Sequence, residues 1–284
     1  MNDRIIYSDL HMHGDYSDAK GSLREFVESA IGKGLDTIGF SDHSPVPFEN
    51  EWSTKKEDFS SYVNEVMELK EEYRGRINIL LGVELDYIDG IDVKGYMGFE
   101  KIPFDYFIGS VHYVYSSILD GYSEVDGPVE DFVHLLENGF NSDSNALIST
   151  YYSTVRKMAA AYKPDFIGHL DLIKKNNRDN EYFDENGELY RKEVNETIDS
   201  IKKLNIPVEI NTGAISRGYT KVPYPSEYIL KLCSEKGMEV TLNSDAHNPG
   251  FVAYGFNEMI ELARKCGFDE IRMMRSGGWS AVKL

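Results

Sequence analysis

Histidines and carboxylates that could bind metal ions are the most informative residues of this chain. His11 and His13 stand two residues apart in the stretch YSDLHMHGDYSD, residues 7–18. Because a β-strand points alternate side chains to the same face, the two imidazoles are expected to lie side by side. One such pair is weak evidence for a metal site, because a histidine can also serve as a simple hydrogen-bonding group.

The remaining histidines follow the same positional rule. Six of the seven stand at the ends of predicted strands, and only His134 does not. The six are His11, His13, His43, His112, His169 and His247, with Glu84 in the third predicted strand and Asp245 after the seventh. In parallel barrels the carboxyl ends of the strands meet at one face, where active sites lie. Imidazole and carboxylate ligands without cysteine suit Zn, Mn or Fe, and this number of ligands predicts two to three divalent ions.

Other carboxylates near these positions have simpler explanations. Asp42 is expected to cap the turn that follows it or to hydrogen-bond His43. Asp171 is expected to brace its strand, and Asp9 to lie in a solvated loop. Asp86 shares a strand face with Glu84, but Glu84 is the preferred ligand because its longer side chain can bridge two metals.

The elements that position these residues alternate between short apolar runs and amphipathic segments. Seven runs predict strands, at residues 4–13, 36–43, 78–87, 104–113, 165–172, 206–213 and 238–247. Six segments predict helices, at residues 22–34, 54–75, 148–162, 188–204, 225–237 and 251–267. This rhythm favours a parallel α/β sheet closed into a TIM-like barrel.

The chain from 1 to 284 has no Gly-, Pro- or Ser-rich linker, which predicts a single domain. Residues 116–132 and 176–188 are expected to be irregular insertions that shape the substrate pocket.

Composition and charge narrow the classes of partner. The chain has 284 residues, 41% of them hydrophobic, and a formal net charge of −18. Such an acidic surface repels phosphate backbones, so no nucleic-acid partner is expected. The sequence has no signal-peptide pattern and no apolar run of membrane-spanning length, and its two cysteines are expected to be buried thiols. We therefore expect a cytoplasmic protein without a membrane partner, whose oligomeric state the sequence leaves open.

The motifs DLHMH, GFSDH, GVELD, GSVH, GHLDL and NSDAH, between residues 9 and 247, resemble those of the PHP (polymerase and histidinol phosphatase) superfamily. The longer stretches GSVHY, GHLDLIKK and EINTGAISRGYTKVPYPSEYIL most resemble the stand-alone histidinol-phosphate phosphatases. This resemblance implies a distorted (β/α)7 barrel with a three-metal centre at its C-terminal face.

The resemblance also implies which residues bind which ion. One ion would be held by His11, His13, Glu84 and Asp245. A second would be held by Glu84, as a bridging ligand, with His112 and His169. A third would be held by Asp18, His43 and His247. Some members of the superfamily have a histidine where this chain has Asp18, and an aspartate there favours a harder metal such as Mn or Fe.

The implied activity is hydrolysis of a small phosphomonoester, L-histidinol phosphate, by a metal-bridging hydroxide, as a step of histidine biosynthesis. Glu84 and Asp245 would act as metal ligands, and His247 or an aspartate beside it as the general acid. The resemblance and a loop position at the active face assign phosphate binding to Arg217, with Lys174 and Lys175 as further candidates.

Two alternatives remain open. The same centre could hydrolyse nucleotides or phosphotyrosine, and a panel of phosphomonoesters assayed side by side would discriminate these activities. The domain could also be a non-catalytic metal-binding module, which the complete ligand set and the lack of an attached domain disfavour.

Overall fold

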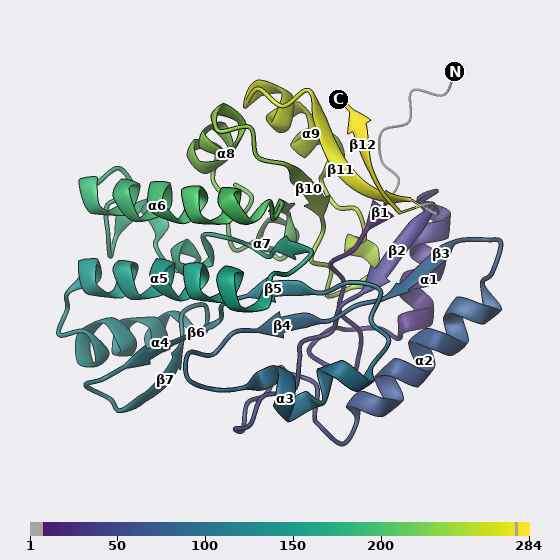
Figure 1. Ribbon diagram of the computed structural model, residues 1–284, viewed down its shortest axis with the longest axis horizontal. Helices are drawn as coiled ribbons and strands as arrows, with labels where there is room; N and C mark the ends of the chain where they lie inside the picture. The colour runs from purple at the N-terminus through teal and green to yellow at the C-terminus, as the bar shows by residue number, and fades with distance from the viewer. Residues whose placement is uncertain (1–7, 276–277) are drawn as a thin grey trace.

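The computed structural model describes residues 8–275 and 278–284, in which short parallel strands alternate with helices (Figure 1). The strands of the parallel sheets are β1 (Ser8–Asp9), β2 (Thr37–Phe40), β3 (Asn78–Leu81), β4 (Glu84–Asp86), β5 (Ile108–Ser110), β8 (Phe166–Ile167), β9 (Val208–Asn211), β10 (Val240–Asn243) and β11 (Glu270–Arg275). The antiparallel strands are β6 (Tyr113–Ser116), β7 (Gly121–Glu124) and β12 (Gly278–Lys283).

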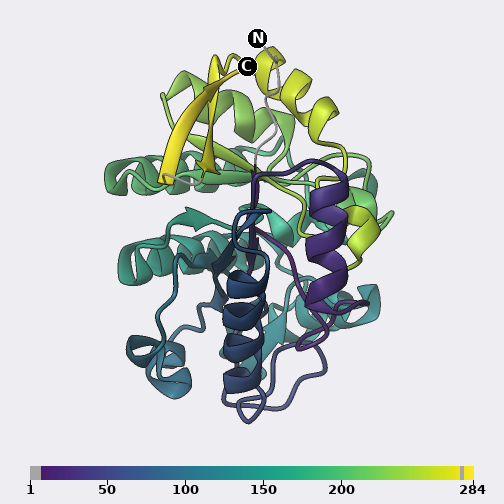
Figure 2. The same cartoon turned by 90° about the vertical axis from the view of Figure 1, so that its right-hand side faces the viewer.

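Helices surround the strands in both views (Figures 1 and 2). They are α1 (Leu23–Gly32), α2 (Phe59–Glu72), α3 (Val93–Met97), α4 (Val129–His134), α5 (Ser144–Tyr162), α6 (Glu188–Leu204), α7 (Gly213–Ser216), α8 (Glu227–Glu235) and α9 (Phe256–Lys265). Short turns of 3₁₀ or π geometry lie at Phe99–Lys101, Leu135–Gly139, Leu172–Lys174, Arg178–Asn180 and Pro249–Phe251. None of the helices in the described part of the chain is long and apolar enough to cross a bilayer.

The strands of the barrel form two arcs, in which neighbouring strands are parallel except for the terminal pair β11–β12. Together the two arcs make a distorted barrel. One arc has the order β1-β2-β3, and the other has the order β12-β11-β10-β9-β8-β5-β4. Isolated bridges join the arcs near the carboxyl ends of the strands, between Met12 and Ala246 and between His43 and Glu84. Both junctions therefore lie at the predicted metal ligands, so the closure of the barrel and the placement of these ligands depend on the same backbone.

The predicted strand over residues 78–87 is broken in two. Its first half pairs with β2 and its second half with β5. The break follows Gly82, where a Cβ atom would lie 2.3 Å from the ring of Tyr106. Tyr106 also occupies the space beside Gly39, and its hydroxyl donates to the carbonyl of Leu10 at 2.6 Å. One buried tyrosine thus fills the barrel below the site and contacts both arcs.

The predicted helices are all present. α1 begins after Ser22, whose backbone N–H donates to the Glu25 carboxylate at 2.8 Å, as its capping-box spacing predicts. α6 has the predicted bounds, whereas α5 begins four residues earlier than predicted, where Asp143 accepts a hydrogen bond from the backbone N–H of Ala146. The apolar faces of these helices pack on the strands and form the two larger hydrophobic clusters of the core.

Two strand pairs were not predicted. Residues 113–124 form the antiparallel hairpin β6–β7, although residues 116–132 were expected to be irregular. The turn of the hairpin includes Asp120 in the left-handed region, and the Ser116 hydroxyl accepts hydrogen bonds from the N–H groups of Ile118 and Leu119. β12 pairs antiparallel with β11 at the end of the longer arc. The expectation for residues 176–188 is confirmed, because they contain only a 3₁₀ turn before α6.

Replacing Tyr106 by Phe is expected to lower the free energy of unfolding by about 1–3 kcal/mol, because the buried carbonyl of Leu10 loses its donor. Tyr115→Phe is the matched control, because Tyr115 is exposed and its hydroxyl donates a hydrogen bond to Asp120. Denaturant unfolding of both variants measures the difference. Equal effects of the two changes would contradict a structural role for the Tyr106 hydroxyl.

Candidate metal centre

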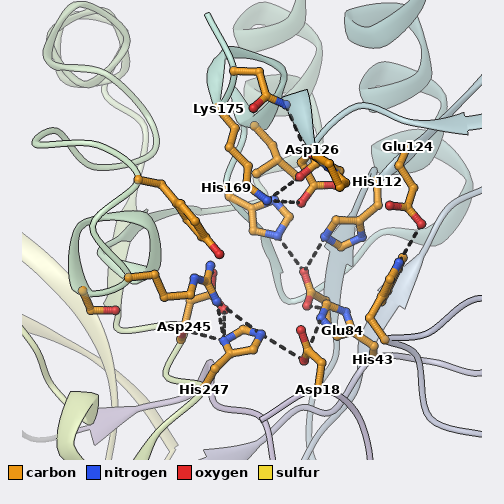
Figure 3. A pocket seen from close by; sticks show the side chains of 18 of the residues that line it. Asp18, His43, Glu84, His112, Glu124, Asp126, His169, Lys175, Asp245 and His247 are labelled. Atoms are coloured by element: carbon orange, nitrogen blue, oxygen red, sulfur yellow. Dashed lines mark hydrogen bonds and ion pairs between the residues drawn. The ribbon is translucent and has the colours of Figure 1, made fainter. Parts of the chain in front are cut away.

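The structure brings all nine predicted metal ligands together at the carboxyl ends of the barrel strands. A cavity of about 890 Å³ opens there, and Figure 3 shows the side chains around it. Seven of the nine line the cavity, namely Asp18, His43, Glu84, His112, His169, Asp245 and His247. The other two, His11 and His13, are fully buried behind them.

Glu84, the first residue of β4, lies at the centre of the cluster. Its Oε2 atom lies 3.2 Å from His11 Nε2 and 3.0 Å from His43 Nδ1. Its Oε1 atom lies 2.8 Å from His169 Nε2 and 3.7 Å from His112 Nε2. Burial alone would raise the pKa of this carboxyl, but the surrounding imidazoles hold it well below its usual value. Glu84 is therefore an ionised carboxylate that can face two ions at once.

Asp18 and Asp245 occupy the opposite side of the cluster from His112 and His169. Asp245 Oδ1 lies 3.3 Å from His13 Nε2, and Asp18 Oδ1 lies 3.1 Å from His247 Nε2. Both carboxyls have lowered pKa values because nearby cationic groups outweigh the effect of burial. Burial lowers the pKa of His13, and the imidazoles of His247 and His43 lower it further, which favours the neutral imidazole that a metal site requires.

The side-chain atoms form four groups that are compact enough to hold an ion. The groups are His11, Glu84 and His169; His11, His13 and Asp245; His43, Glu84 and His112; and His13, Asp18, His43 and His247. These four groups share most of their members with the three predicted ligand sets. In the predicted sets only Glu84 is shared, whereas in the structure His11, His13 and His43 also belong to two groups each. The first group adds His11 to the predicted pairing of Glu84 with His169.

Several buried atoms of these groups have no hydrogen-bond partner in the described part of the chain. They are His11 Nε2, both ring nitrogens of His13, His43 Nδ1, His169 Nδ1 and Glu84 Oε2. Buried polar atoms are rarely left unpaired, because each one costs free energy. Metal ions are the partners that suit such a concentration of imidazole nitrogens and carboxylate oxygens. The donor set and its unpaired atoms therefore fit a centre of divalent ions.

Two further carboxylates support the ligands from behind. Asp86 Oδ1 lies 2.7 Å from His112 Nδ1. Burial lowers the pKa of His112, but Asp86 and Glu84 together raise it to about 10. Glu209, in the middle of β9, lies 3.0 Å from His11 Nδ1. The sequence analysis missed Glu209, for which the only signal was a charged residue inside an apolar run.

The predictions for the neighbouring aspartates have mixed outcomes. Asp42 accepts from the backbone N–H of Gly14 at 3.0 Å and from the Ser17 hydroxyl at 2.6 Å. It therefore caps the loop that carries Asp18, and not the turn that follows Asp42 as expected. The expectation that Asp9 is solvated is wrong. Asp9 is fully buried and accepts from the backbone N–H groups of residues 244 and 253, so it ties β1 to the segment after β10.

The predicted phosphate-binding cations differ in their placement. Arg217 lines the cavity, where its Nη2 lies 3.1 Å from Asp245 Oδ2 and its Nη1 contacts His247. Lys175 also lines the cavity and bonds the carbonyl of Asp126. The structure does not bring Lys174 to the cavity.

Lys174 is buried instead, with its ammonium group 2.8 Å from Asp171 and 3.0 Å from the carbonyl of Pro223. Asp171 also accepts from the backbone N–H of Ser226, which confirms its expected bracing role. The pair therefore fastens the segment after β8 to the segment before α8. A buried lysine with two partners is a structural feature that the bare dipeptide Lys174-Lys175 does not reveal.

The β6–β7 hairpin and the loop after β2 form one wall of the cavity. Trp52 Nε1 donates to Glu124 Oε1 at 2.8 Å, and the Tyr113 hydroxyl donates to the same oxygen at 3.1 Å. The indole lies against the imidazole of His43, with ring centroids 4.5 Å apart. This wall depends on the hairpin, so the sequence analysis missed Trp52.

The fold and the cluster first define a class: barrels with a histidine- and carboxylate-rich centre at the strand ends, an arrangement suited to metal-assisted hydrolysis. The comparison with protein families then gives the particular family. The PHP domain matches residues 9–213, and the chain belongs to the PHP domain family. The resemblance seen in the six motifs is thereby confirmed.

Curated relatives cover nearly the full length of the chain. The "Probable histidinol-phosphatase" of Deinococcus radiodurans is 30% identical over 266 residues, which are 91% of this chain and 93% of the relative. The histidinol-phosphatase of Bacillus subtilis is 26% identical and covers 89% of this chain and 98% of its own.

The fold also matches a solved structure. The histidinol phosphate phosphatase of Lactococcus lactis, crystallised with Zn, L-histidinol and phosphate, superposes with a TM-score of 0.73 over 96% of this chain and 98% of its own. Its sequence identity is 22%. The superposition confirms the predicted distorted (β/α)7 barrel.

Gly213, the first residue of α7, provides a test of how closely Asp245 must be packed. A Cβ atom at Gly213 would lie 2.5 Å from Asp245 Oδ2, so Gly213→Ala is expected to displace this carboxylate and to lower the metal content. Gly32→Ala is the control, because a Cβ atom there meets nothing within 4 Å. Elemental analysis after dialysis against buffered Zn checks the prediction, and unchanged stoichiometry in Gly213→Ala would contradict it.

Proposed function

We propose that this protein is a metal-dependent phosphatase that hydrolyses L-histidinol phosphate to L-histidinol and inorganic phosphate, as a step of histidine biosynthesis. The observation that carries the proposal is the buried cluster around Glu84, whose unpaired imidazole and carboxylate atoms suit several divalent ions. Membership of the PHP domain family and the names of the full-length relatives support the choice of substrate.

Two to three divalent ions are proposed to bind at the strand ends, with Zn, Mn and Fe as the metals that suit these ligands. The proposed ligands are His11, His13, Asp18, His43, Glu84, His112, His169, Asp245 and His247. The structure of the Lactococcus lactis relative with Zn supports this cofactor class. When bound, such ions supply Lewis acidity to the phosphoryl group and an acidified water as nucleophile.

The side chains of the chain itself are proposed to orient and protonate the ester. Arg217 contacts Asp245 and His247 in the cluster and would bind non-bridging phosphate oxygens, and Lys175 is a second candidate on the same cavity. Asp245 and His247 adjoin Arg217, and His247, or an aspartate beside it, is the proposed proton donor to the leaving alcohol. Most side chains of the cluster are buried, and the low local dielectric strengthens each of these interactions.

The remaining expectations about partners extend this proposal. A cavity of about 890 Å³ accommodates a small phosphomonoester. The net charge of −18 supports the absence of a nucleic-acid partner. The protein is further proposed to act as a single domain, in the cytoplasm and without a membrane partner.

A different substrate for the same centre is the second candidate, because the cavity is larger than one histidinol phosphate molecule requires. Nucleoside monophosphates and phosphotyrosine are the esters to compare. A substrate panel assayed on one metal-loaded preparation decides between them through the ratio of kcat/KM values.

Glu84→Gln is expected to abolish most of the metal binding and activity together while the fold persists. The change removes the negative charge that lies beside four imidazoles. The fold should persist because Glu84 is not part of the hydrophobic core. Elemental analysis, activity and circular dichroism are measured on the same preparation. Wild-type protein should hold more than one equivalent of metal. Near-normal turnover of Glu84→Gln would contradict the central position of this carboxylate.

Arg217→Ala is expected to reduce kcat/KM for L-histidinol phosphate by the equivalent of about 2–4 kcal/mol, the scale of one preorganised charge-stabilising group. Metal content should stay near the wild-type level, because the guanidinium is not a ligand. Arg191→Ala is the matched control, since that arginine lies on the exposed face of α6. If the two variants have equal kcat/KM values, the proposed phosphate contact of Arg217 is wrong.

A further inference from the structure

Glu209 is a buried carboxylate that accepts hydrogen bonds from four different groups. Oε1 lies 3.0 Å from His11 Nδ1, 2.8 Å from the backbone nitrogen of His169 and 2.8 Å from Asn211 Nδ2. Oε2 lies 3.0 Å from His11 Nδ1 and 3.0 Å from Asn243 Nδ2. The side chain of Glu209 is fully buried.

The two asparagine amides around Glu209 have a fixed orientation. Asn243 Oδ1 accepts the backbone N–H of Leu10 at 3.0 Å, and Asn211 Oδ1 accepts the backbone N–H of Gly213 at 2.8 Å. Because a backbone N–H can only donate, each amide must turn its NH₂ group toward Glu209. The backbone N–H of His169 is a donor as well. Glu209 therefore faces three fixed N–H donors, and these suit the acceptor oxygens of a carboxylate.

The same carboxylate fixes the proton of His11. Nδ1 lies 3.0 Å from both oxygens of Glu209, so this nitrogen carries the proton. The other nitrogen, Nε2, faces the cluster, where it lies 3.2 Å from Glu84 Oε2 and has no hydrogen-bond partner in the described residues, so Nε2 is the atom of His11 that would bind an ion. A carboxylate behind a histidine in this way holds the ring orientation and increases its basicity as a ligand.

The partners of Glu209 also span the junction between the two arcs. His11 follows β1, His169 follows β8, Asn211 ends β9 and Asn243 ends β10. β1 and β10 belong to different arcs, and Asn243 reaches across to the backbone of Leu10. Figure 1 shows β1 beside β10 at this junction. A single ionised side chain therefore contacts both the junction and a candidate ligand.

We propose that Glu209 is a positioning residue that couples the joining of β1 to β10 with the affinity of the metal centre, through the Nδ1–H of His11. The inference rests on the proposed metal centre. It assigns a function in metal binding to β9, a strand that provides none of the nine proposed ligands. It also explains why a carboxylate occupies the interior of an apolar strand.

The first experiment compares Glu209→Gln with the wild type for Zn affinity, by competition with a chromogenic chelator. An amide NH₂ at position 209 would face other donors, so affinity is expected to fall by about 10–100-fold, the scale for loss of such a partner. Glu193→Gln is the matched control, because Glu193 is a buried carboxylate paired with Arg156 between α5 and α6. Its Zn affinity should equal that of the wild type.

The second experiment separates positioning from a general loss of stability. In a His11→Ala background, the further change Glu209→Gln should lower the thermal midpoint of the metal-free protein but leave Zn affinity nearly unchanged. If Glu209→Gln does not fold, Glu209→Asp keeps the charge at a shorter reach and should still weaken Zn binding. Wild-type Zn affinity in a folded Glu209 variant would overturn the inference alone. Failure of the wild type to bind Zn would overturn the proposed metal centre as well.

Discussion

The burial of Glu84 among four imidazoles is the constraint on which the rest of the structure depends. A carboxylate with no exposed surface is tolerable only when its charge is compensated. His11, His43, His112 and His169 provide that compensation, and they come from four separate strand ends. Each imidazole must therefore lie within about one side-chain length of the same point, and the convergent strand ends of the barrel place them there.

The barrel that satisfies this constraint is irregular. Its two arcs are joined by isolated β-bridges at the proposed ligands. Where the regular strand pairing ends, side chains complete the junction. Asp9 accepts backbone N–H groups across the β1–β10 junction, and Tyr106 fills the interior beneath it. The catalytic face is consequently also the place where the fold is closed. Removing a polar group there is expected to affect stability and metal binding together, which is why paired measurements are needed.

The sequence predicted the parts of the protein that are encoded locally. Strand and helix periodicity, the capping box at Ser22 and the histidines at strand ends all depend on near neighbours in the chain, and the structure confirms them. What it did not predict depends on contacts between distant segments. The break after Gly82 needs Tyr106, and the burial of Lys174 needs Asp171 and a distant carbonyl. Glu209 is a charged residue whose partners come from three other strand ends.

The central claim is that the buried cluster makes this PHP-domain protein a phosphatase for L-histidinol phosphate. The most direct measurement is steady-state hydrolysis by protein loaded with Zn or Mn, compared with the same protein after chelation. L-Histidinol phosphate, a nucleoside monophosphate and p-nitrophenyl phosphate are assayed in parallel. We expect metal-dependent turnover with the highest kcat/KM for L-histidinol phosphate. Equal or lower kcat/KM for that ester would contradict the substrate, and activity that survives complete removal of metal would contradict the metal-dependent mechanism.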